Sequence, residues 1–138
     1  MRNGETVFVD SGAWIALALT QDPDHEQARD LWRTLMGLGT RLRTSIPVVL
    51  ETFTFLDRNT ERDVALAWRA SLKGLERFQI LECTLADLGG SWAYFVRRDL
   101  HKLSAVDATS FTIMKRKQIR TAFAFDHHFA VAGFRLVG

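Results

Sequence analysis

Short apolar runs rich in β-branched and aromatic residues alternate along this chain with longer segments whose apolar residues recur every three or four positions. Each short run predicts a buried strand, and each longer segment predicts an amphipathic helix. Strands that alternate with helices favour an α/β fold with a mostly parallel central sheet and right-handed crossovers. The expected strands are residues 6–9, 41–44, 78–81, 119–125 and 134–137.

Residues that commonly begin and end helices mark the segments between these strands. A helix over 13–19 follows the first strand. Asp22 and Pro23 predict the cap and the first position of the next helix, which Gly37 and Gly39 end. The candidate caps of four later helices, the last of them over 105–116, are Ser45, Thr60, Thr84 and Ser104.

Length and composition are those of one globular domain, which we expect to span residues 1–138. Hydrophobic residues make up 47% of the chain, so disorder is excluded, yet no apolar run approaches the roughly 18 residues of a membrane span. The single cysteine, Cys83, excludes an internal disulfide, and we interpret it as a small buried hydrophobe. Together with the absence of a signal-peptide pattern, these features predict a cytoplasmic protein without a membrane partner.

Positive charge is concentrated in one part of the chain, although the net charge of +2 is too small to identify a nucleic-acid binder. Only Asp99 and Asp107 oppose the basic residues between positions 97 and 120. These cations could hold an RNA backbone beside a cleft, or about half of them could belong to a solvated helix surface. They are Arg97, Arg98, Lys102, Lys115, Arg116, Lys117 and Arg120.

Four acidic residues stand where this architecture gives them special positions. Asp10 directly follows the strand 6–9, and Asp126 directly follows the strand 119–125. Parallel strands end at the same edge of a sheet, which is where open α/β sheets bind ligands. Asp107 lies in the first turn of the helix 105–116, and Glu51 lies in a strongly apolar helix where an unpaired buried carboxylate would be costly.

Each acid also has a structural interpretation when it is taken alone. Asp10 could cap the helix that follows it, and Asp107 could complete a capping box with Ser104. Asp126 could begin a turn into His127 and His128, whose role as turn residues is favoured over that of a catalytic base. Glu51 could simply be solvated. The conjunction of four acids at one edge of one sheet favours a shared site.

An all-oxygen cluster of this kind predicts a metal ion. Carboxylates held close together repel one another unless they are protonated or bind a cation. Oxygen ligands select a hard ion, so we expect Mg²⁺, with Mn²⁺ as the other possibility. The chemistry that such a site favours is displacement at phosphorus by a metal-activated water.

Four segments of the chain resemble the PIN-domain ribonucleases, and especially the toxin half of VapBC-type toxin–antitoxin pairs. They are Val7-Phe8-Val9-Asp10-Ser11, the run from Thr44 to Glu51, Leu103-Ser104-Ala105-Val106-Asp107-Ala108, and Phe125-Asp126-His127-His128-Phe129. The closing segment, residues 132–136, also resembles the final strand of the family.

The resemblance implies a PIN-like fold and metal-dependent endonucleolytic cleavage of RNA. It assigns Asp10, Glu51, Asp107 and Asp126 to the catalytic, metal-binding site, with Ser11 as a supporting hydroxyl. It also implies a separate antitoxin protein that blocks the acidic cleft, and a homodimer, for which the apolar residues Ile15, Leu19, Leu31 and Leu35 are candidate interface positions. Gly12 and Ala124 depart from the family, which often has small polar residues there, and their loss would loosen the orientation of the ligands.

Two other functions remain open at this stage. One is a housekeeping PIN nuclease of RNA processing, and the other is a catalytically degenerate PIN fold that only binds a partner. A haloacid-dehalogenase-like phosphatase is excluded because it needs a second acid two residues after the first, where this chain has Gly12.

Overall fold

Five parallel strands form one sheet in the order β3-β2-β1-β4-β5. The coordinates are a computed structural model that describes residues 2–137. The strands are β1 (Thr6–Val9), β2 (Arg41–Ser45), β3 (Phe78–Leu81), β4 (Thr121–Phe123) and β5 (Arg135–Leu136). The predicted α/β class with about five short, mostly parallel strands is therefore confirmed.

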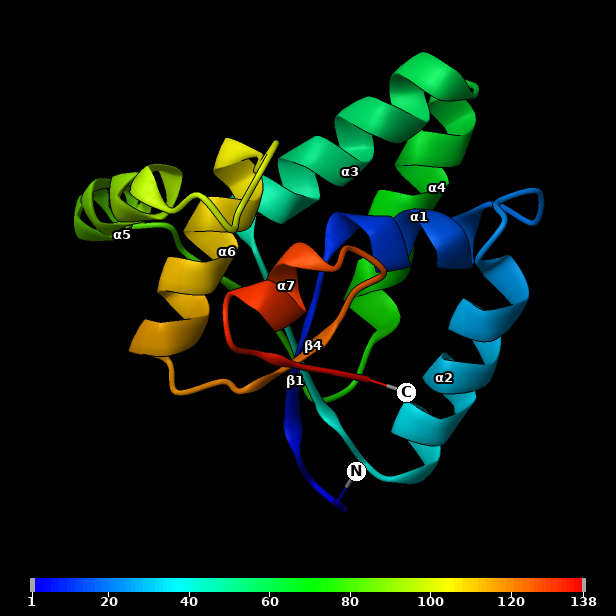
Figure 1. Ribbon diagram of the computed structural model, residues 1–138. Coiled ribbons are helices and arrows are strands. Elements are labelled where there is room, and N and C mark those ends of the chain that lie inside the picture. The colour runs from blue at the N-terminus through cyan, green and yellow to red at the C-terminus, as the bar shows by residue number, and fades with distance from the viewer. Residues whose placement is uncertain (1, 138) are drawn as a thin grey trace.

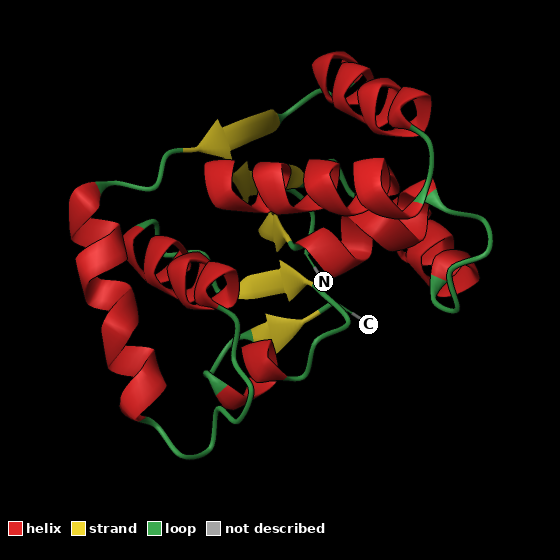
Figure 2. Ribbon diagram, turned by 90° about the horizontal axis from the view of Figure 1, so that it is seen from above, coloured by secondary structure: helices red, strands yellow, loops and turns green. Residues whose placement is uncertain are grey.

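Helices cover both faces of this sheet, with α5 and α6 on one side and α1 and α2 on the other (Figures 1 and 2). No helix within residues 2–137 is long and apolar enough to cross a membrane. The α-helices are α1 (Ser11–Ala18), α2 (His25–Gly37), α3 (Ile46–Asn59), α4 (Arg62–Ser71), α5 (Leu85–Ser91), α6 (Ala105–Arg116) and α7 (His128–Val131). Two 3-10 helices, η1 (Leu72–Gly74) and η2 (Trp92–Val96), follow α4 and α5.

The central strand β1 is buried on both of its faces, which explains why its sequence is continuously apolar. Val7, Phe8 and Val9 are fully buried. Strands that helices cover on both faces have this composition, because neither face meets water. On the α1 side, the ring of Trp14 packs against those of Trp32 and Trp68 at centroid distances of 5.9 and 6.0 Å.

The order of the strands places a switch point beside β1. From β1 the chain moves outward through β2 to β3, and it then returns to the other side of β1 to form β4 and β5. Such reversals leave a crevice at the carboxyl ends of the two central strands, where open α/β sheets bind ligands. Asp10 and Asp126 follow these two strands.

Two predicted helix starts are wrong, in both cases because a side chain serves the neighbouring turn instead. Asp22 accepts the Asp24 amide at 2.8 Å in a turn, so α2 begins only at His25. Thr60 donates its hydroxyl to the Leu56 carbonyl and ends α3, while Glu61 precedes α4. Ser45 caps α3 as predicted, since its hydroxyl accepts the Val48 amide at 3.3 Å.

The helix expected after Thr84 is split into α5 and η2. Thr84 and Asp87 form a capping box at its start, and Gly90 lies so close to α6 that an added Cβ would stand 3.2 Å from the Thr112 methyl group. The pair of glycines at 89–90 weakens the α-helix and allows this approach. The strands β4 and β5 are shorter than predicted, and a short helix, α7, stands where a turn was expected. Cys83 is half-buried, whereas a buried position was predicted.

The residues proposed above for an interface lie inside or against the core. Leu35 is fully buried, and Ile15, Leu19 and Leu31 are partly covered. Exposed apolar side chains lie instead on α5 and η2, where Leu85 and Val96 are more than 80% exposed and Trp92 is 56% exposed. Of the tryptophans, Trp14 and Trp68 are buried in the core, whereas Trp92 faces outward.

Candidate metal centre

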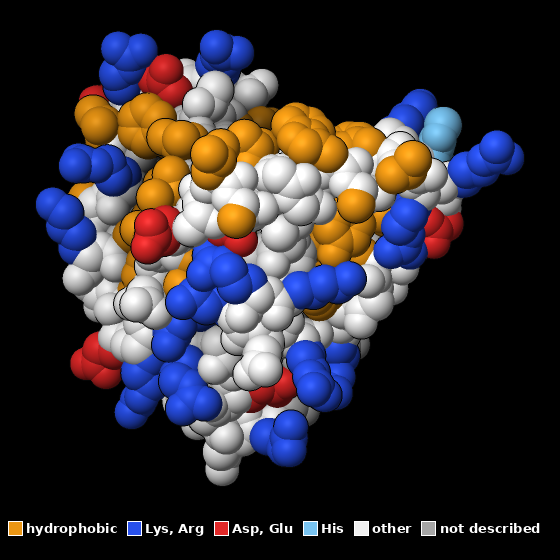
Figure 3. Space-filling model, turned by 90° about the vertical axis from the view of Figure 1, so that its left-hand side faces the viewer, with side chains coloured by type: hydrophobic (Ala, Val, Ile, Leu, Met, Phe, Trp, Pro, Cys, Tyr) orange, Lys and Arg blue, Asp and Glu red, His pale blue; other side chains and the backbone are white. Residues whose placement is uncertain are grey.

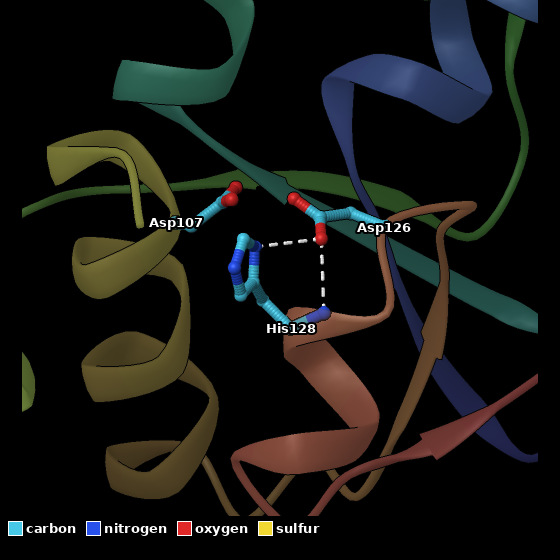
Figure 4. A group of neighbouring side chains, drawn as sticks. All are labelled: Asp107, Asp126 and His128. Carbon is cyan, nitrogen blue, oxygen red and sulfur yellow. Dashed lines mark hydrogen bonds and ion pairs between the residues drawn. The ribbon is translucent and has the colours of Figure 1, made fainter. Parts of the chain in front are cut away.

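The carboxylates of Asp107 and Asp126 point toward one another across the crevice (Figure 4). Asp107 comes from the first turn of α6, which Ser104 caps by accepting the Asp107 amide at 3.0 Å. Asp126 follows β4 and precedes α7. Ligand atoms of these two residues and of His128 all lie within 4.8 Å of one another, a spacing that one metal ion can bridge.

His128 holds Asp126 in place through two contacts. The Asp126 Oδ1 accepts the His128 amide at 2.9 Å and lies 2.8 Å from the ring nitrogen Nδ1 (Figure 4). The other ring nitrogen, Nε2, lies 2.6 Å from the His101 carbonyl oxygen. The His101 carbonyl can only accept, so the hydrogen on Nε2 is donated to it, whereas Nδ1 has no hydrogen-bond partner within residues 2–137. His128 therefore positions Asp126 through its backbone amide, and in the neutral ring its Nδ1 lies within reach of an ion shared by Asp107 and Asp126.

Asp10 contributes a buried carboxylate at the end of β1. The residue is 4% exposed, and its Oδ1 has no hydrogen-bond partner within residues 2–137. The Asp10 amide donates to the Phe123 carbonyl at 3.0 Å, which fixes the end of β1 beside β4. Asp10 occupies the N-cap position of α1, but its side chain makes no capping hydrogen bond. The structural interpretation as a helix cap is therefore wrong for this carboxylate.

The pKa values of these acids are shifted in the way that a crowded, buried anionic site requires. Burial raises the pKa of Asp10 to about 7, and the charges of Glu51 and Asp126 act in the same direction. Burial and the charge of Asp10 also raise the pKa of Asp107. For Asp126, hydrogen bonds from Asp107 and His128 outweigh burial, so its pKa falls below the ordinary value. A bound cation would favour the charged form of all three.

Glu51 reaches the site from α3 and is held by Ser11. The Ser11 hydroxyl donates to Glu51 Oε1 at 2.5 Å, which joins the start of α1 to α3. Glu51 is only half-buried, and it lies outside the tight group formed by Asp107, Asp126 and His128. Its charge nevertheless acts on the pKa values of Asp10 and Asp107, which places it close to both.

The capping-box interpretation of Asp107 holds only in part, because Ser104 caps α6 while the carboxylate faces Asp126. The turn interpretation of Asp126 is correct, and it coexists with a place in the acidic group. The contact between His128 and Asp126 was not predicted. The sequence signal for it is the spacing, since a histidine two residues after an acid in a turn can bring its ring beside the carboxylate. At Gly12, an added Cβ would stand 3.9 Å from Asp10 Oδ2, an ordinary van der Waals contact, so a small side chain would fit there without a clash.

The predicted basic segment divides into paired and unpaired cations. Arg116 binds the buried Asp87 with two contacts of 2.8 Å and also donates to the Glu82 carbonyl, so it is structural. Arg97 is paired with Asp99 at 2.7 Å. Lys115 stands over the ring of Tyr94, 5.3 Å from its centroid, and forms no ion pair within the described chain.

Comparisons with known proteins agree with this fold. Residues 7–135 match the PIN domain family. The chain is 38% identical over 129 residues to "23S rRNA-specific endonuclease VapC20" of Mycobacterium tuberculosis, from strains CDC 1551 / Oshkosh and H37Rv, across 93% of this chain and 95% of the relative. The chain belongs to the PIN-domain family.

A solved structure of the same relative matches the architecture. The crystal structure of Mycobacterium tuberculosis VapC20, described there as a sarcin–ricin loop cleaving toxin, superimposes with a TM-score of 0.82 at 34% sequence identity. The match covers 93% of this chain and 95% of that one. The resemblance inferred from the four sequence segments is thus confirmed over nearly the whole chain.

Proposed function

We propose that this protein is a metal-dependent endoribonuclease and the toxin of a VapBC-type toxin–antitoxin pair. The observation that supports it best is the meeting of Asp107 and Asp126 at the switch point beside the buried Asp10, whose Oδ1 has no hydrogen-bond partner within residues 2–137. An isolated buried carboxylate of this kind is costly unless a cation or a proton neutralises it. The likeness to a toxin endonuclease over 93% of the chain supports the same function.

The residues of the crevice suit Mg²⁺, with Mn²⁺ as a substitute, because carboxylate oxygens predominate among the ligand atoms there and His128 adds a single ring nitrogen. Asp10, Asp107, Asp126 and Glu51 would hold the ion, directly or through water. A bound divalent ion supplies charge neutralisation and lowers the pKa of a coordinated water. Ser11 orients Glu51 and His128 orients Asp126, and hydrogen bonds of this type preserve ligand geometry.

Ribosomal RNA is the proposed substrate. The relative is named for cleavage of 23S rRNA, and its solved structure is described as cleaving the sarcin–ricin loop. At 38% identity over nearly the full length, that loop is the first RNA to test on this chain. The housekeeping alternative receives no comparable support.

Cleavage of an RNA that contains the sarcin–ricin loop tests the proposal. We expect cleavage with Mg²⁺ or Mn²⁺, loss of cleavage in excess chelator, and recovery when the metal is restored. The Asp126→Asn variant is the matched inactive control. Cleavage that survives the chelator would exclude the metal mechanism, and metal binding without cleavage of any RNA would favour a degenerate binding module.

Two protein partners belong to the proposal. A cognate antitoxin would cover the crevice with a basic segment, since the crevice is acidic. A second copy of the chain would cover an apolar band on the face that carries α5 (Figure 3). The exposed side chains of α5 and η2 are Leu85, Leu88, Trp92, Phe95 and Val96. Exposed apolar clusters of this size commonly mark interfaces.

A further inference from the structure

A basic hollow lies at the end of the sheet away from the acidic crevice. It has a volume of about 600 Å³ and is formed by the last turn of α6, the chain entering β4 and the chain entering β5. Three cations from these three segments line it, namely Lys115, Arg120 and Arg135. Gln118 adds an amide, and no carboxylate belongs to the lining.

The three cations are brought together by the fold and not by one stretch of sequence. The Arg135 amide donates to the Arg120 carbonyl at 2.8 Å where β4 and β5 begin, so these arginines flank one another. Lys115 approaches from α6, and its ammonium group is held over the Tyr94 ring. Tyr94 itself is 7% exposed, which fixes the ring that positions the lysine.

The positive charge of this hollow is not cancelled by its surroundings. Within residues 2–137, Lys115 and Arg120 have no ion-pair partner, and Arg135 has only a loose contact with Glu5 at 3.8 Å. One carboxylate against three cations leaves a surplus of about two charges. A lysine in the last turn of α6, Lys115, is expected because it stabilises the negative end of the helix dipole. The helix dipole gives no such reason for Arg120 and Arg135, which lie at the starts of strands.

We infer that this hollow binds a phosphate group of the RNA substrate at a distance from the point of cleavage. The inference rests on the proposed ribonuclease function and deepens it, because it requires an RNA that extends beyond the crevice. Lys115 lies eight residues after Asp107 on the same helix, or about 12 Å along its axis. A folded RNA spans that length, whereas a dinucleotide does not.

Two hollows meet at the C-terminal half of α6. Lys115 borders both the basic hollow and a second hollow lined by Tyr94, Arg97 and Thr112. Basic side chains gather below the apolar band on this side of the molecule (Figure 3). An RNA backbone that follows α6 would therefore meet positive charge along its path, which favours phosphate over an uncharged ligand.

Glutamine substitutions at the three cations test the inference. Lys115→Gln, Arg120→Gln and Arg135→Gln are compared with Arg29→Gln, an exposed cation on α2 at the other side of the sheet (Figure 1). Binding of a sarcin–ricin stem-loop RNA is measured in chelator by fluorescence anisotropy at several salt concentrations. We expect each of the three variants to reduce the salt slope by about 1, and Arg29→Gln to leave it unchanged.

Cleavage kinetics and competition complete the test. The three variants should raise KM for the stem-loop and leave kcat and the cleavage of a dinucleotide unchanged. If all three variants keep the wild-type salt slope and the wild type cleaves RNA normally, the hollow does not bind RNA phosphate, while the proposed ribonuclease function still stands. A wild type that neither binds nor cleaves RNA would overturn the proposed function as well. Binding of polyglutamate that requires these cations, with RNA binding unaffected, would assign the hollow to an acidic protein and also overturn the inference.

Discussion

Ser11 and Glu51 are joined by a hydrogen bond of 2.5 Å between the Ser11 hydroxyl and Glu51 Oε1. The bond ties the start of α1, directly after Asp10, to the second turn of α3. It fixes an acid that is half-exposed and would otherwise be free to rotate away from the crevice. Two segments that are 40 residues apart in sequence thereby present their acidic groups to one place.

Removal of this hydroxyl should weaken metal binding more than folding. In Ser11→Ala, the Mg²⁺ concentration for half-maximal cleavage should rise by roughly 10-fold or more, because Glu51 loses its orienting donor. The melting temperature should change little, since the residue lies at the rim of the core. Titration of activity with Mg²⁺ measures the effect, and Ser11→Thr should restore most of it. Equal metal dependence in Ser11→Ala and the wild type would contradict this role.

His128 should matter to the site, whereas its neighbour His127 should not. His128→Phe keeps an aromatic ring but loses both ring nitrogens, so Asp126 should lose its neighbouring nitrogen and metal affinity should fall by roughly 10- to 100-fold. The matched control is His127→Phe, because His127 is 79% exposed and lies 3.8 Å from Asp126. Mg²⁺-induced thermal shifts compare the two variants. Similar shifts in both would show that His128 does not position Asp126.

A mostly parallel sheet of about five strands was predictable, because the strand segments have a distinctive composition and their alternation with helices favours parallel pairing. The acids Asp10, Asp107 and Asp126 were predictable for the same reason, since their places follow from where the strands and α6 begin or end. Side-chain pairs that form only through three-dimensional contact could not be predicted from the sequence. Arg116 resembles its neighbours Lys115 and Lys117 in sequence, yet only the packing of α5 against α6 shows that it pairs with Asp87. The helix starts at Asp22 and Thr60 failed because the same residue types favour turns and caps equally.

The pair formed by Asp87 and Arg116 should be a stability element. Asp87 is 2% exposed, and Arg116→Met would leave its charge buried without a partner. Because Arg116 is 36% exposed, the expected loss is about 2 kcal/mol, less than for a fully buried pair. The control is Arg97→Met. Its partner Asp99 is 55% exposed, so this substitution should cost much less stability than Arg116→Met. Urea unfolding of both variants measures the difference, and equal losses would contradict the assignment.

The same pair predicts a loss of stability in acid. The hydrogen bonds from Arg116 lower the pKa of Asp87 from its ordinary value of 3.8. A carboxyl with a lowered folded-state pKa stabilises the protein above its unfolded-state pKa, and this contribution disappears as the pH falls through the folded-state pKa. The free energy of unfolding should therefore decrease below about pH 4 in the wild type. Asp87→Asn should show a smaller decrease over that range, and an identical acid profile would count against the pair.

The apolar band predicts the assembly state. Leu85→Glu or Trp92→Glu should convert a dimer into a monomer, because a charge would be buried at the interface formed by α5 and η2. The melting temperature of the monomer need not fall, since both side chains are largely exposed in the single chain. Sedimentation velocity measures the change, and Met36→Glu, an exposed apolar residue on α2, is the control. If the wild type is a monomer, or if all variants remain dimers, the face formed by α5 and η2 is not a dimer interface.

Neutralisation of one central acid should separate the metal site from the fold. In Asp10→Asn, the metal-free protein should be as stable as the wild type or more stable by about 1 kcal/mol, because repulsion within the cluster decreases. Cleavage should be lost, since a neutral amide cannot replace the buried carboxylate. Magnesium should raise the melting temperature of the wild type and not that of the variant, because a ligand that binds only the folded state stabilises it. Thermal unfolding in chelator and in Mg²⁺ gives all three comparisons, with Asp22→Asn as a control outside the site. If Asp10→Asn melts well below the wild type in chelator, Asp10 supports the fold, and the acidic cluster is not an unsatisfied cation site.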